Sequence, residues 1–110
     1  MGASLLEYHV LLALASGTLH GYAIAERVAG ESRGALRPRA GSLYRVIARL
    51  VSEGLVTESD GEIEPPHPGL ARRYYALTAA GRRALGEEAR RLKQMAAAAE
   101  KRLGLARGRS

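Results

Sequence analysis

The sequence predicts a small, mostly α-helical domain with one β-hairpin and a long final helix. Three observations predict this fold class. Apolar residues recur at helical spacing in three short segments within residues 4–54. Two runs suited to strands, at residues 55–59 and 70–78, enclose a loop rich in Pro and Gly. Residues 79–104 then carry an apolar seam with heptad spacing.

The first predicted helix covers residues 4–16. Ser4 and Glu7 have the spacing of a capping box, which satisfies backbone N–H groups at a helix start. Leucine and valine side chains cover more than one face of this helix, and such a helix is buried on most sides. Because a chain of 110 residues buries a modest core, we expect Leu5, Tyr8 and Leu12 to face a second subunit.

The second and third helices are predicted at residues 21–32 and 40–54, with a turn at Pro38 between them. His20, in the connector before the second helix, is expected to make a structural hydrogen bond. On a helical wheel the third helix has an apolar stripe and a polar opposite face. The stripe consists of Leu43, Val46, Ile47 and Leu50. The opposite face holds Ser42, Arg45, Arg49 and Ser52, and Tyr44 lies at one border of the stripe.

The two strands predict an antiparallel hairpin, in which alternation separates the side chains of the returning strand onto two faces. Tyr75 and Leu77 share one face, opposite Arg72, Tyr74 and Ala76.

Thr78 is the predicted cap of the last helix. The apolar seam of this helix advances by 4, 3, 4, 3 and 4 residues, which predicts packing against a partner helix. The seam, a predicted dimer interface, consists of Leu85, Ala89, Leu92, Ala96, Ala99 and Leu103. The chain therefore divides into residues 1–77, a winged-helix domain, and residues 78–105, a dimerisation helix. Residues 106–110 are expected to be a disordered tail.

Three short helices, a hairpin and a long helix, in this order, are the layout of a winged helix-turn-helix, whose third helix enters the major groove of DNA. The residues then aimed at DNA are Ser42, Tyr44, Arg45 and Arg49. The charge agrees with a polyanionic partner, because the net charge is +6 and the pI is about 10.3. Between residues 27 and 49 there are six Arg and one acidic residue. Two other interpretations remain open: the Arg bias can reflect a GC-rich genome, and the polar face can be an ordinary solvated surface.

The hairpin loop carries Asp60, Glu62 and Glu64, which repel phosphate. Arg72 and Arg73 follow this loop. They either contact DNA at the base of the wing or pair with Glu58 or Glu62 across the hairpin.

Catalytic and metal-binding functions have little support in the sequence. There is no Cys, and the three His residues lack metal-ligand spacing. The sequence shows no pattern typical of a catalytic nucleophile, an acid–base pair or a phosphate-binding loop. We therefore expect no enzymatic activity, no cofactor and no metal. The longest apolar run is too short to cross a bilayer, and no signal peptide is visible. A cytoplasmic protein with no membrane association is the expectation.

Three local patterns, with the single long helix after them, resemble the PadR-type transcriptional regulators. They are "LLALASGTLHGYAIAERV", "AGSLYRVIARLVSEGLV" and "RRYYALTAAGRRAL". The resemblance covers roughly residues 5–92 and is to the smaller subfamily with one C-terminal helix. It implies a winged-helix homodimer that represses transcription from a palindromic operator.

Matched to the family's motifs, "SLYR" implies that Ser42, Tyr44 and Arg45 contact DNA. "HGY" implies a backbone contact by Tyr22, and "RRYY" places Arg72 and Arg73 at the base of the wing. The chain has "RPRAG" where members often have Ser or Thr with Pro, so Arg37 or Arg39 can add phosphate contacts. The wing loop is also longer and more acidic than usual.

Some members of this family sense phenolic acids or planar drugs at the dimer interface. Here only Tyr8 could stack on such a ligand, since the chain has no Trp or Phe. A small-molecule effector therefore stays unknown. The alternative function is a winged-helix protein-interaction module that docks an acidic partner. The preferred hypothesis is a sequence-specific repressor that binds double-stranded DNA.

Overall fold

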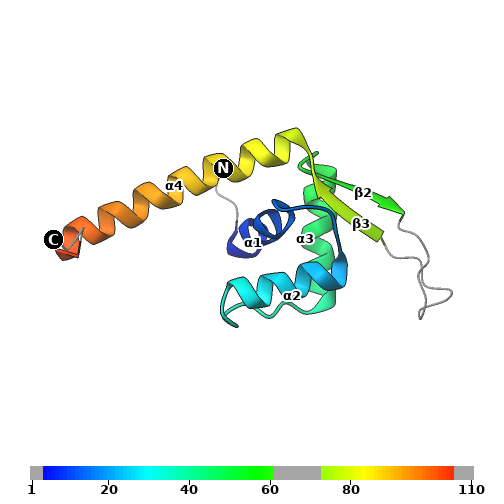
Figure 1. Cartoon of the computed structure of the whole chain (residues 1–110), viewed down its shortest axis with the longest axis horizontal. Helices are drawn as coiled ribbons and strands as arrows, with labels where there is room; N and C mark the ends of the chain where they lie inside the picture. Colours follow the sequence, from blue (N-terminus) through cyan, green and yellow to red (C-terminus); the bar gives the residue numbers. More distant parts are fainter. Residues whose placement is uncertain (1–3, 61–72, 106–110) are drawn as a thin grey trace.

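The computed structural model describes residues 4–60 and 73–105, and it confirms the predicted fold class (Figure 1). The elements in chain order are α1 (Leu5–Leu14), β1 (Leu19–His20), α2 (Gly21–Glu31), α3 (Ala40–Ser52), β2 (Val56–Asp60), β3 (Arg73–Leu77) and α4 (Ala79–Leu103). The three short helices and the sheet form one body, and α4 extends well beyond it.

The core of this body forms where α1, α2 and α3 meet the sheet. Ser4 and Glu7 form the predicted capping box, so α1 begins where the sequence predicts. The helix then places its apolar residues against α2, α3, β3 and α4. The fully buried large side chains are Val10, Leu11, Leu14, Ile24, Val28, Leu43, Ile47, Leu50 and Val56. The predicted core stripe of α3 is confirmed, with Val46 only partly buried.

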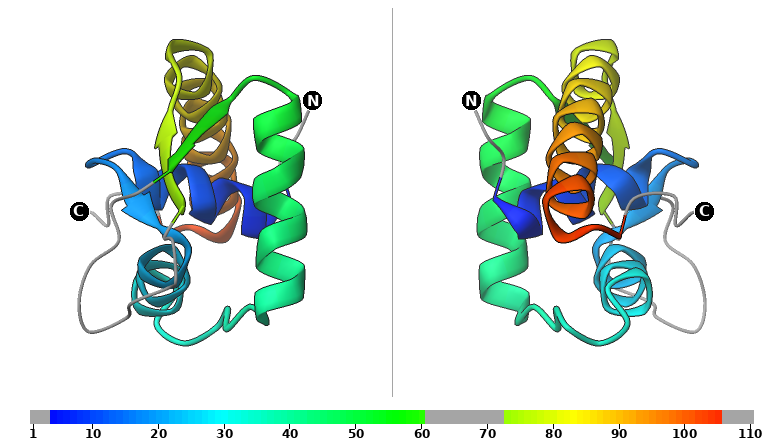
Figure 2. Two further views of the ribbon diagram at one scale, coloured as in Figure 1. Left: turned by 90° about the vertical axis from the view of Figure 1, so that its right-hand side faces the viewer. Right: turned by 90° about the vertical axis from the view of Figure 1, so that its left-hand side faces the viewer.

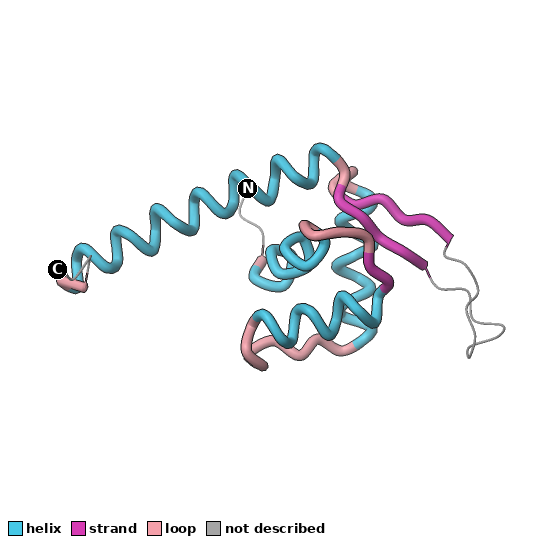
Figure 3. Tube along the Cα trace, in the orientation of Figure 1, coloured by secondary structure: helices cyan, strands magenta, loops and turns pink. Residues whose placement is uncertain are grey.

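The sheet has three antiparallel strands in the order β1-β3-β2, rather than the two of the predicted hairpin (Figure 3). Glu58 faces Tyr75 across the hairpin, and Val56 faces Leu77. On the other edge, Leu19 pairs with Tyr75 and His20 with Tyr74. The strand β1 has only two residues, which is too short for an alternating pattern of apolar and polar residues. It forms because it pairs with β3, so the sequence of the connector before α2 did not predict a strand.

Gly81, in the first turn of α4, marks a close approach between this helix and the turn that links α3 to β2. A Cβ atom at Gly81 would lie 2.0 Å from the Leu55 carbonyl oxygen, so only glycine fits there. Thr78 caps α4 as predicted and also donates to the Gly54 carbonyl at 2.6 Å. These contacts fix the direction in which α4 leaves the body.

The outer half of α4 has no packing partner within the described chain, and every residue from 93 to 105 is exposed. Figure 2 shows α4 nearly end-on, behind the body in one view and in front of it in the other, with α3 along one edge of the body. None of the helices within residues 4–60 and 73–105 has a sufficiently long apolar stretch to span a lipid bilayer.

Candidate nucleic-acid interface

Helices α2 and α3 form a helix-turn-helix whose second helix has one free long side (Figure 2). The entry to α2 is fixed by His20, because its Nδ1 accepts a hydrogen bond from the backbone N–H of Ala23 at 3.2 Å. This is the structural hydrogen bond that the sequence predicts for His20. The imidazole also stacks on Tyr22 and meets Tyr74 of β3 edge-on. The start of α2 is thereby tied to the sheet.

Tyr44 connects α3 to α2 through a contact that sequence reasoning missed. Its ring lies so close to Gly21 that a Cβ atom there would be 2.1 Å from the hydroxyl oxygen and 2.7 Å from Cζ. The tyrosine of "SLYR" and the glycine of "HGY" are therefore packed together, although they lie 23 positions apart in the sequence. Tyr44 keeps 47% of its surface exposed, so its outer edge remains available to a ligand.

Arg45 lies on the outer side of α3, almost opposite the buried stripe. It is exposed, and its guanidinium donates a long hydrogen bond of 3.4 Å to the Ser42 hydroxyl. No ion pair holds Arg45 among the described residues. A guanidinium fork held near a hydroxyl, on a helix with a free side, suits bidentate contact with guanine.

Arg49 has a different environment from Arg45, although both were predicted to face DNA. Its guanidinium pairs with the Glu7 carboxylate of α1 at 3.0 Å. The Arg49 side chain is 58% exposed, whereas that of Glu7 is 8% exposed. The arginine therefore covers a nearly buried acid on the α1 side of α3.

The remaining predicted phosphate contacts lie around the start of α2 and α3. Arg39 occupies the N-cap position of α3 without a side-chain capping bond, and Arg37 is also exposed. Tyr22 is 68% exposed. The Glu26 carboxylate raises the pKa of the Tyr22 hydroxyl, through hydrogen bonding and through its charge. A phosphate contact by Tyr22 would therefore compete with the Glu26 carboxylate for the hydroxyl proton.

At the wing, Arg73 forms an ion pair with Glu58 across the hairpin. Of the two possibilities that the sequence offers for Arg73, DNA contact or pairing across the hairpin, the structure shows the pairing with Glu58. Below this pair, burial raises the pKa of Tyr75, and the charge of Glu58 adds to the effect. Arg72, Glu62 and Glu64, which belong to the same predictions, lie outside the described residues.

The predicted dimer face joins part of α1 to the length of α4. Leu5 and Leu103 are largely exposed, and Tyr8, Leu12, Leu85, Ala89 and Leu92 are partly buried. Ala96 and Ala99 are exposed. The seam is thus anchored to the body at Leu85 and becomes free toward the C-terminus.

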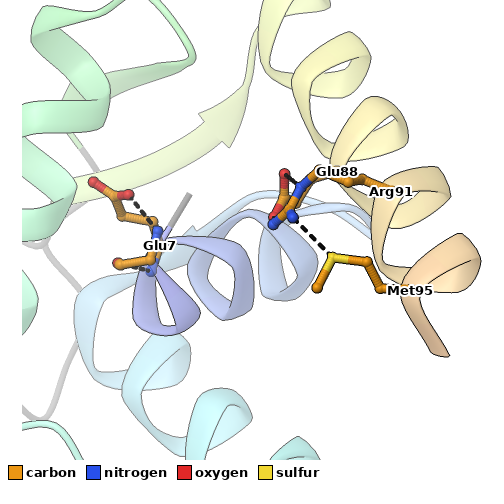
Figure 4. A network of polar contacts seen from close by, with 5 residues as sticks. Glu7, Glu88, Arg91 and Met95 are labelled. Atoms are coloured by element: carbon orange, nitrogen blue, oxygen red, sulfur yellow. Dashed lines mark hydrogen bonds and ion pairs between the residues drawn. The ribbon is translucent and has the colours of Figure 1, made fainter. Parts of the chain in front are cut away.

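Glu88 lies beside this seam on α4 and is 7% exposed. It binds the Arg91 guanidinium through both carboxylate oxygens, and Arg91 also contacts the sulfur of Met95 (Figure 4). The carboxylate raises the pKa of Arg91. Within the described ranges, no three His, Cys, Asp or Glu residues come together as a metal site.

Residues 10–87 match the model of the transcriptional regulator PadR-like family. The transcriptional regulator Rv3488 of Mycobacterium tuberculosis is 34% identical over 88 residues, which cover 80% of this chain and 76% of that protein.

Two solved structures show the same fold. PadR of Bacillus subtilis, in complex with operator DNA, has a TM-score of 0.67 and 26% identity, covering 76% of this chain and 46% of that one. A PadR family regulator from Clostridium difficile R20291 has a TM-score of 0.76 and 21% identity, covering 91% and 99%. The chain belongs to the PadR-like family of transcriptional regulators.

Proposed function

We propose that this chain represses transcription as a homodimer that binds an inverted-repeat operator, with α3 as its recognition helix. One observation carries the proposal: Arg45 stands exposed and without an ion-pair partner in the described structure, on the free side of the second helix of a helix-turn-helix. An arginine so placed can discriminate guanine by ~1–3 kcal/mol. The structure of Bacillus subtilis PadR with operator DNA supports the same use of the shared fold.

In the proposed complex, phosphate contacts and base contacts come from different residues. Arg37 and Arg39 at the start of α3, with Tyr22 on α2, surround the recognition helix and would hold the sugar–phosphate backbone. Such contacts set register and affinity but carry no sequence information. Arg45 then faces the base edges, and the hydroxyls of Ser42 and Tyr44 suit further phosphate contacts. A protein that acts on duplex DNA in this way is expected in the cytoplasm.

A homodimer is supported by the shape of α4. This helix has 25 residues, and its outer half is exposed on all sides. Isolated helical turns are marginal in water without packing. An alanine-rich heptad seam continues along this half, so a second copy of α4 is the natural partner. Two recognition helices would then meet half-sites about one turn of DNA apart.

The test is binding of Arg45→Ala to duplexes enriched from a randomised pool by the parent protein. We expect a loss of ~1–3 kcal/mol on the enriched sequence and a relaxed preference at one base pair of each half-site. Arg102→Ala, an exposed arginine near the end of α4, is the matched control for lost charge. If Arg45→Ala binds as tightly and selectively as the parent, α3 is not the recognition helix. A parent that prefers no duplex and stays monomeric would favour the protein-interaction module instead.

A further inference from the structure

Glu7 is a nearly buried carboxylate whose two oxygens serve two different helices. Its Oε1 accepts the backbone N–H of Ser4 at 2.8 Å and completes the cap of α1. Its Oε2 meets the Arg49 guanidinium of α3 at 3.0 Å. Only 6% of Glu7 is exposed. Figure 4 shows it at the beginning of α1, and it lines the same pocket as Glu88 and Arg91 of α4.

The buried state of Glu7 makes this contact hard to break. A buried carboxylate that loses its cation remains as an uncompensated charge, which is strongly destabilising. Arg49 is half-exposed and could otherwise rotate outward, but the acid beneath it favours the inward position. If Arg49 moved from Glu7 to a DNA phosphate, the Glu7 carboxylate would remain buried without its cation, which would destabilise the protein.

The position of Arg49 on α3 agrees with this role. Arg49 and Val46 lie on the border of α3 that faces α1, whereas Arg45 lies almost opposite the core. Tyr44 occupies the other border, against Gly21 of α2. The recognition helix is therefore braced on both sides, by Tyr44 toward α2 and by Arg49 toward α1.

We infer that Glu7 and Arg49 are a positioning pair: they fix the orientation of the recognition helix on α1 and keep Arg49 off the DNA. The inference rests on the proposed DNA-binding function of α3 and assigns two arginines of one helix to different tasks. Arg45 discriminates bases. Arg49 affects DNA binding indirectly, by holding α3 in its orientation. Its ion pair with Glu7 keeps it from contacting a DNA phosphate.

The experiment compares Arg49→Met with Arg45→Met, the same substitution four residues away on the same helix. Glu7→Gln is the third variant, because glutamine preserves the capping box but removes the charge under Arg49. Each protein is titrated with the enriched duplex and with every single-base variant of one half-site. Titrations at several salt concentrations give the slope of log K against log salt, which reports the number of phosphate contacts.

Arg45→Met should lose about 5- to 150-fold in discrimination at one base pair. Arg49→Met should lose affinity for the enriched duplex evenly across the half-site, with the parental salt slope, because the helix is misplaced rather than a contact removed. Arg49→Lys, which keeps a cation over Glu7, should recover part of that loss. Glu7→Gln should free Arg49 for phosphate, steepen the slope by about 0.9 for each subunit and tighten binding to unrelated DNA.

Three results overturn the inference. The first is that Arg49→Met flattens the slope of log K against log salt and loses affinity at a single base pair. The second is that Arg49→Met folds and binds DNA like the parent. The third is that Glu7→Gln leaves the salt slope unchanged. If Arg49→Met does not fold, the double variant Glu7→Gln/Arg49→Met leaves no stranded charge and must show the same evenly spread loss. Should Arg45→Met itself bind like the parent, the proposed recognition helix fails, and the inference falls with it.

Discussion

Gly81→Ala tests the junction at which α4 leaves the winged helix. The added Cβ would lie 2.0 Å from the Leu55 carbonyl oxygen and 3.1 Å from the Leu77 side chain. Cβ atoms essentially never approach an oxygen closer than 3.0 Å, so the first turn of α4 must move by about 1 Å. Because Leu55 contributes a backbone atom, no rotamer change can relieve the contact.

The magnitude follows from the bonds that this movement stretches. Thr78 donates its backbone N–H to the Leu55 carbonyl at 3.1 Å and its hydroxyl to the Gly54 carbonyl at 2.6 Å. Two hydrogen bonds contribute ~1–3 kcal/mol, and overpacking adds ~1–3 kcal/mol. Alanine recovers up to about 1 kcal/mol of helix propensity. We therefore expect the free energy of unfolding to fall by about 1–5 kcal/mol.

The assay is urea unfolding followed by circular dichroism at one protein concentration, since the proposed dimerisation would make the apparent stability depend on concentration. Gly30→Ala is the control, because Gly30 lies in α2 with no atom within 4 Å of the added methyl group. Its stability should rise by about 0.4–1 kcal/mol. If Gly81→Ala is as stable as Gly30→Ala, the contact with Leu55 does not constrain α4.

Three further outcomes are expected. Leu92→Arg places a charge in the middle of the α4 seam and should give a monomer by light scattering; a dimer of parental stability would refute the seam. Gly21→Ala should displace the Tyr44 ring and lower the free energy of unfolding by about 1–3 kcal/mol in the same urea assay, and a gain like that of Gly30→Ala would contradict the packing. Arg39→Ala should weaken binding to all duplexes alike and flatten the salt slope by about 0.9 per subunit, whereas selective loss on one sequence would indicate a base contact.

The elements of the fold were predictable because their signals are local. The Ser4–Glu7 capping box, the Thr78 cap and the four-residue core stripe of α3 each lie within one helix, and the structure contains all three. The extra strand β1 was missed for the opposite reason. Leu19 and His20 become a strand only because β3, more than fifty residues later, pairs with them.

The site was predictable only in part, because a helical wheel gives the direction of a side chain but not what it meets. Arg45 and Arg49 share one face by spacing, and nothing in α3 distinguishes them. The distinction comes from Glu7, which the sequence presents as a capping residue of another helix. Likewise, the need for glycine at positions 21 and 81 depends on Tyr44 and Leu55, which only the tertiary structure brings near.

Helix α1 links the two proposed functions of the chain. It contributes Leu5 and Tyr8 to the predicted dimer face, it packs against α4, and through Glu7 it holds Arg49 of the recognition helix. In the proposed dimer, a change in how the two subunits pack on α1 would therefore act on the orientation of α3. Since half-site spacing is set by the geometry between two recognition helices, Leu5→Ala should alter the preferred spacing between half-sites, measured with operators lengthened or shortened by one base pair. A dimer that keeps both its affinity and its spacing preference would show that α1 does not couple the dimer interface to DNA binding.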